Sequence, residues 1–135
     1  MSMISETKEA LWAYIKNNWT ETDVHWPGSK FQTQDHAEWI QVSLSGVDQG
    51  AMRSPEDELR AVDVEVNVFC KFGTSLYRTD EISSAVIAML EHKSISVSGS
   101  ITRMLRLREA SLNDVPNELD LQQHSIRLFG TLERT

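Results

Sequence analysis

The sequence predicts an α+β fold in a single domain, with a mostly antiparallel β-sheet and two α-helices packed on one of its faces. A length of 135 residues is that of one domain. Several stretches alternate apolar and polar residues, which is the pattern of a half-buried strand. Only two stretches have helical periodicity, and strands do not alternate regularly with them. The expected order is α-β-β-α-β-β-β, which favours an antiparallel sheet over a parallel one.

The strand at the centre of this sheet is expected at residues 61–72. Apolar side chains stand at every second position, so one face of the strand is expected in the core and the other in a polar environment. Cys70, the single cysteine of the chain, lies on the apolar face and is expected to be a buried thiol without a disulfide partner. The apolar positions are Val62, Val64, Val66, Val68, Cys70 and Phe72, and the polar ones are Asp63, Glu65, Asn67 and Lys71, with Phe69 as the exception.

Residues 5–19 and about 80–91 have the apolar spacing of amphipathic helices. Ser5 is expected to cap the first helix and Thr79 the second, because both side chains can accept a bond from an unpaired backbone N–H. The expected buried positions are Ile4, Leu11, Trp12, Ile15 and Trp19 in the first helix, and Ile82, Ala85, Val86, Met89 and Leu90 in the second.

The remaining strands are expected at residues 39–45, 95–97, 101–108 and 121–132, the last of them near the centre of the sheet. Residues 20–28 are expected to form a connector, and 31–34 a short extended piece. Residues 46–60 and 109–120 have no periodicity and are expected to be irregular. The first of these two is longer than a hairpin requires, so it is either disordered or an arm that docks on a partner.

The sequence predicts a protein without catalytic residues, cofactor or metal, because it contains no motif for any of them. The four histidines have no metal-ligand spacing, and Asp35-His36 with Glu38 is best explained as a surface loop. The chain contains no nucleophile elbow, P-loop or dinucleotide-binding fingerprint. No apolar run is long enough for a membrane span, and the polar N-terminus is not a secretory signal. A reduced cytosolic environment is compatible with the single cysteine.

Charge gives the candidate interaction residues. The net charge of −7 argues against nucleic-acid binding through phosphate neutralisation and favours repulsion between copies. Acids on the polar face of strand 61–72 and arginines in strand 101–108 could be solvated, could pair across strands, or could form a seam between subunits. The candidates are Arg53, Asp57 and Glu58 in the long loop, Asp63 and Glu65 on the central strand, and Arg103, Arg106 and Arg108 on the late strand.

The pattern of the whole chain resembles the tail terminator (tail-completion) proteins of long-tailed bacteriophages, the lambda-type minor tail proteins. The likeness covers almost all of the chain and concerns element order, length and hydrophobic pattern. Its features are the helix containing Ala10-Leu11-Trp12-Ala13-Tyr14-Ile15, the connector with Trp26-Pro27-Gly28 and Phe31, the strand Trp39-Ile40-Gln41-Val42, the long loop, the strand 61–72, the Phe72-Gly73-Thr74 lead into a helix, and the amphipathic strand 124–132.

This resemblance implies a structural virion protein that is assembled in the host cytoplasm. It implies a hexameric ring that caps the head-proximal end of the tail tube, stops tube polymerisation and binds head-completion proteins. DNA would pass through the lumen without specific binding, for which a negative charge is suitable. If Asp63 and Glu65 line that lumen, replacing both with lysine should slow DNA passage. The family has no catalytic residues to transfer to this chain.

Two other interpretations remain open. A head–tail connector or neck protein of the same virion would also form a ring. A small monomeric α+β enzyme or ligand-binding domain would instead need a concave apolar pocket with convergent polar groups.

Overall fold

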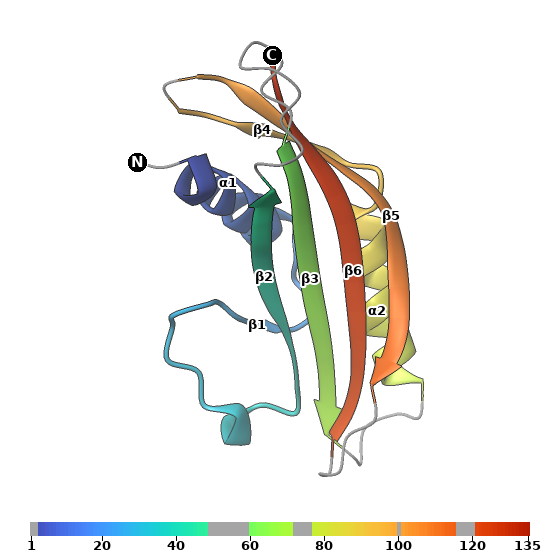
Figure 1. Ribbon diagram of the computed structural model, residues 1–135. Helices are drawn as coiled ribbons and strands as arrows, with labels where there is room; N and C mark the ends of the chain where they lie inside the picture. The colour runs from blue at the N-terminus through green and yellow to red at the C-terminus, as the bar shows by residue number, and fades with distance from the viewer. Residues whose placement is uncertain (1–2, 49–59, 72–76, 100, 116–120) are drawn as a thin grey trace.

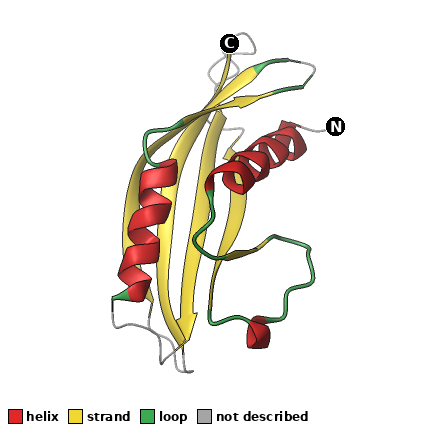
Figure 2. Cartoon of the chain, turned by 180° about the vertical axis from the view of Figure 1, so that it is seen from behind, coloured by secondary structure: helices red, strands yellow, loops and turns green. Residues whose placement is uncertain are grey.

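The computed structural model describes residues 3–48, 60–71, 77–99, 101–115 and 121–135. Its strands form one six-stranded sheet in the order β1-β2-β3-β6-β5-β4 (Figure 1). Four of the five strand pairings are antiparallel, and only β1 and β2 are parallel. Both helices lie on the same face of the sheet (Figure 2). The predicted α+β fold is therefore confirmed.

The elements follow one another along the chain much as the periodicity predicts, with β1 and a 3-10 turn added. Their bounds are α1 Met3–Asn18, β1 Asp23–His25, the 3-10 turn η1 Thr33–Asp35, β2 Glu38–Asp48, β3 Arg60–Lys71, α2 Arg78–Leu90, β4 Ser94–Val97, β5 Arg103–Val115 and β6 Leu121–Arg134.

Strand β3 lies between β2 and β6 at the centre of the sheet, as its valine pattern predicts. Its alternate side chains from Val62 to Cys70 are buried on the helix side. Leu11 and Ile15 of α1 and further apolar residues of α2 belong to the same core. The core therefore forms between the sheet and the helices, which leaves the opposite face of the sheet without a helix among the described residues (Figure 1). Neither described helix is long and apolar enough to cross a membrane.

The predicted helix caps are wrong. Ser5 lies inside α1, which begins at Met3, and Ile4 is 42% exposed rather than buried. Thr79 lies inside α2, and its hydroxyl donates to Gln122 Oε1 at 2.8 Å. The Thr79 hydroxyl is used in a tertiary hydrogen bond to β6 and not in a helix cap. The sequence of the helix alone does not predict this partner.

Four predictions about irregular or extended segments are also wrong in part. Residues 109–115 belong to β5, and residues 46–48 belong to β2. Residues 33–35 form a 3-10 turn rather than an extended piece, and β1 lies within the expected connector. The segment 110–115 contains Ser111, Asn113 and Asp114, yet it pairs with residues 123–128 of β6, so the ladder overrides its weak strand propensity. Phe72 to Ser75 and residues 49–59 of the long loop lie outside the described residues.

Candidate functional site

The face of the sheet opposite the helices, called here the open face, carries three of the five candidate residues that the structure describes: Asp63, Glu65 and Arg106. Because side chains alternate along a strand, the residues between the buried positions of β2, β3 and β6 point to this face. Asp63 and Glu65 lie there, as predicted, with neighbours from β6 directly opposite them. The polar residues of the open face include Gln41, Ser43, Asp63, Glu65, Asn67, Gln123, Ser125 and Arg127.

The charges of the open face are paired across strands within the chain. Arg127 donates to Asp63 Oδ2 at 2.6 Å, and this bond raises the pKa of the guanidinium above its ordinary value. Ser125 donates to Glu65 Oε1 at 3.0 Å. Arg106 donates to Glu133 Oε2 at 2.9 Å. Cross-strand pairing, one of the three possibilities that the sequence left open, therefore accounts for these contacts.

The predicted arginine trio does not share one face. Arg103 is buried on the helix side, 3.9 Å from Glu6 Oε2 of α1, whereas Arg106 lies on the open face. An odd separation along a strand places two side chains on opposite faces. Arg108 is exposed at a bulge of β5 between Leu107 and Ala110. Arg53, Asp57 and Glu58 lie outside the described residues.

An open groove of about 580 Å³ lies at this bulge. Phe129, a 62% exposed aromatic residue on β6, forms one side of it. The Arg127 guanidinium lies 6.0 Å from the centre of the Phe129 ring, which is within cation–π range. An aromatic ring among arginines is typical of surfaces that bind partners. The lining residues are His92, Ser94, Arg106, Leu107, Arg108, Glu109, Ala110, Ser111 and Phe129.

An aromatic cluster at one end of the sheet was missed by the sequence reading. Trp39 stacks on Phe69, with ring centres 5.1 Å apart, and Phe31 stacks on both His25 and His36 at 4.9 and 4.3 Å. His36 also contacts Asp23 Oδ2 at 2.7 Å. These contacts fasten the connector between β1 and β2 to the sheet. Phe69 is the one apolar residue at a polar position of β3, and this exception in the sequence indicated its contact with Trp39 on the open face.

A serine, a histidine and an aspartate meet on the helix side. Ser83 Oγ lies 2.9 Å from His124 Nδ1, and Asp114 Oδ1 lies 3.2 Å from His124 Nε2. Asp80 Oδ1 is 3.7 Å from the same nitrogen. Ser83 is only 1% exposed inside α2, so its hydroxyl is closed to a substrate. The group instead fastens α2 to β6 and β5. Within the described ranges, no cluster of three or more histidine, cysteine, aspartate or glutamate residues could hold a metal ion.

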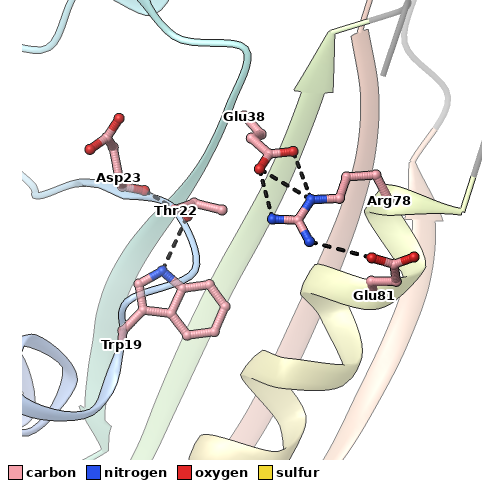
Figure 3. Close-up of polar contacts among 6 residues, drawn as sticks. All are labelled: Trp19, Thr22, Asp23, Glu38, Arg78 and Glu81. Carbon is pink, nitrogen blue, oxygen red and sulfur yellow. Dashed lines mark hydrogen bonds and ion pairs between the residues drawn. The ribbon is translucent and has the colours of Figure 1, made fainter. Parts of the chain in front are cut away.

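A second fastening joins the start of α2 to the sheet. Arg78 makes two bonds from Nε and one from Nη2 to the Glu38 carboxylate, at 2.8–3.1 Å, and a longer one of 3.4 Å to Glu81 (Figure 3). Glu38 raises the pKa of Arg78 above its ordinary value. Nearby, the Trp19 indole donates to Thr22 Oγ1 at 3.1 Å, which fixes the chain between α1 and β1 (Figure 3).

Comparison with known proteins identifies the fold and no family. No protein-family model matches the chain, and no curated protein matches it. A solved structure that carries no functional name is similar over 98% of this chain and 93% of that chain, with a TM-score of 0.59 and 12% sequence identity. A likeness at this identity concerns the fold alone, since one fold supports many functions.

Proposed function

We propose that this protein is a phage tail terminator, a structural protein whose copies form a ring on the head-proximal end of the tail tube. The ring, a hexamer by analogy with that family, would stop tube polymerisation and offer a surface to head-completion proteins. The resemblance in element order and hydrophobic pattern supports the class of protein. Support for ring formation comes from the edges of the sheet.

The observation that carries the proposal is a sheet with two incompletely covered edges. Strands β2, β3, β6 and β5 are successive antiparallel neighbours, so β2 and β5 run in opposite directions. Strand β1 pairs only with Trp39–Gln41 of β2. Strand β4 pairs only with residues 103–106 of β5. The outer sides of 42–48 and 111–115 therefore have no strand partner among the described residues.

Uncovered edges of this kind favour association between copies. Suppose that successive copies are related by rotation about an axis parallel to the strands. The β5 edge of one sheet then meets the β1–β2 edge of the sheet in the next copy. That contact joins different surfaces of the two copies, and repeated contacts of this type close into a ring when the rotation allows it. The open face and the loops would then be available to the lumen, the tube protein and the head-completion proteins.

The same proposal assigns a location and partners. The protein would reside in the virion, at the head-proximal end of the tail, after assembly in the host cytoplasm. DNA would cross the lumen without specific binding, which a net charge of −7 favours. The role is that of a structural protein that needs no catalytic residue and no cofactor.

Two further candidates have support. A neck or head–tail connector protein would use the same sheet edges for its ring. A monomeric ligand-binding domain would instead use the groove of about 580 Å³ beside Phe129.

Electron microscopy of the purified protein, alone and with the tube protein of the same virus, tests the proposal. We expect rings with a central channel, and capped tubes whose length no longer increases with time. Rings that bind heads but not tubes would favour the connector. A protein that stays monomeric with and without tubes, and that binds a small molecule, would contradict both ring-forming roles.

A further inference from the structure

We propose that the outer edge of β5 pairs in antiparallel fashion with β1 of a second copy, with Leu112 opposite Val24. This inference rests on the ring proposed above and names the strands that would join neighbouring copies. It follows from the level of the two edges in the sheet, from their direction, and from the side chains that they carry.

The two edges lie at nearly the same height of the sheet. Val24 pairs with Ile40, which lies beside Val68, and Val68 pairs with His124. Leu112 pairs with Ile126 on the other side of the sheet. Val24 is thus level with His124 of β6 and Leu112 is level with Ile126, so the two edge residues differ in height by only two residues. A copy placed beside another by rotation would bring β1 against the uncovered part of β5, with a small shift along the strands.

The directions of the strands suit this contact. Strand β1 is parallel to β2, whereas β5 runs opposite to β2 through three antiparallel steps. The new pair would therefore be antiparallel and would continue the sheet into the next copy. The segment of β5 before Ser111 is occupied by its own chain, since Leu107 N–H donates to the Lys93 carbonyl and Ala110 N–H to Glu91. This restricts the new pairing to 111–115.

The side chains select one register. Leu112 is 46% exposed on the helix side of β5, and Val24 packs against the core on the helix side of β1. Placing them opposite one another covers Leu112 with an apolar neighbour. Asp23 then stands opposite Asn113, and Asp114 opposite Thr22, so no two like charges face each other directly.

The register without a shift is less suitable. It would place Asp114, which is 91% exposed, beside the apolar Val24, and would bring Leu112 level with Trp26, which lies beyond the end of β1 and already packs on Trp12 of its own chain. A stagger between neighbouring copies is also expected in a closed sheet, because the strands of a barrel are tilted and shifted in register. Pairing of β5 with β5 of a second copy is disfavoured, because it would bring Asp114 of both copies close together, along with Asp80, which contacts the same His124 as Asp114.

Disulfide cross-linking tests this register in the full chain. The variant with Val24→Cys and Leu112→Cys should give, after mild oxidation, a ladder of covalent multimers on a non-reducing gel. Each single variant should lack the ladder, and native Cys70 is buried and adds little background. The pair Glu9→Cys with Ser84→Cys, exposed on the two helices, measures cross-linking by collision. The pair Val24→Cys with Asp114→Cys reports the unshifted register.

A charge at the contact gives an independent test. Leu112→Lys should raise the concentration at which half of the copies assemble by about tenfold or more, whereas Leu112→Val should change it little. Sedimentation velocity measures both. Rings in the microscope without a ladder from the first cysteine pair would overturn this inference and leave the ring itself intact. Leu112→Cys alone giving dimers would instead indicate β5–β5 pairing, and a protein without any assembly would contradict both proposals.

Discussion

Glu6 of α1 lies directly against Gly99, in the turn between β4 and β5, in the space that a side chain at position 99 would occupy. The same carboxylate is 3.9 Å from the buried Arg103. Helix α1 therefore contacts the β4–β5 hairpin through a charged pair, beside a glycine whose missing side chain leaves room for the Glu6 carboxylate. This relationship between a helix and a turn about 90 residues later could not be read from either segment alone.

Gly99→Ala should destabilise the fold by about 1 kcal/mol, because the added methyl group displaces the Glu6 carboxylate, the flexible end of its side chain, and disturbs its contact with Arg103. Denaturant unfolding followed by circular dichroism measures the change. Ser98→Ala, at the exposed neighbouring position, is the matched control and should stay within about 0.5 kcal/mol of the wild type. Equal stability of the two variants would show that Glu6 moves away without cost.

Glu38→Gln should lower the free energy of unfolding by about 1–2 kcal/mol, because it removes the charged acceptor of three Arg78 bonds at a position only 24% exposed. Glu81→Gln is the matched control. Its contact with Arg78 is longer and its side chain is 60% exposed, so its effect should stay below about 0.5 kcal/mol. The prediction fails if the two variants unfold at the same denaturant concentration.

Phe31→Ala should destabilise the protein by about 1–2 kcal/mol, because Phe31 stacks on His25 and His36 and holds the connector between β1 and β2. Phe129→Ala removes the same side chain from a 62% exposed position and should change stability by less than about 0.5 kcal/mol. Hydrogen exchange of residues 23–38 gives a local readout. Unchanged protection there in the Phe31 variant would contradict a fastening role for the stack.

The Cys70 thiol should react slowly with a thiol reagent in the native protein and fast in denaturant. Burial raises the pKa of Cys70 above its ordinary value, and a hydrogen bond with Thr79 opposes part of the rise. Both the closed position on β3 and the low thiolate fraction reduce reactivity. A native rate close to that of a free thiol at pH 8 would contradict this prediction.

The same shift predicts how stability depends on pH. A group whose pKa is raised in the folded state contributes stability that is fully present below its unfolded pKa, about 8.5 for cysteine, and is lost as pH rises through the folded pKa. Between about pH 8.5 and 10, the wild type should therefore lose stability more steeply than Cys70→Ala, by up to about 1.4 kcal/mol per pH unit. Parallel pH profiles of the two proteins would rule out this linkage.

Periodicity determined the parts of the fold in which burial on one side fixes the pattern. The alternation from Val62 to Cys70 predicted a long strand with one buried face, and this strand is central in the sheet. The helical spacing of Leu11 with Ile15 and of Ile82 with Val86 predicted both helices. Each of these patterns is local, and one apolar face is enough to specify it.

Candidate residues were predicted less well than elements. The alternation placed Asp63 and Glu65 on the open face, but their partners Arg127 and Ser125 come from a strand about 60 residues later. The arginines of β5 were grouped by sequence proximity, although Arg103 and Arg106 point to opposite faces. Phe129 and the groove beside it depend on a bulge in β5 that no local signal marked.

The sequence by itself determined the class of fold, the central strand and the helices, because the hydrophobic effect acts on each segment through its own apolar face. Only the tertiary structure decided that residues 110–115 form a strand, that Thr79 bonds to Gln122, and that Arg103 lies beneath α1. Each of these results from hydrogen bonds or charge contacts with another element of the chain. Such partners are fixed by the register of the sheet, which exists only once the chain has folded.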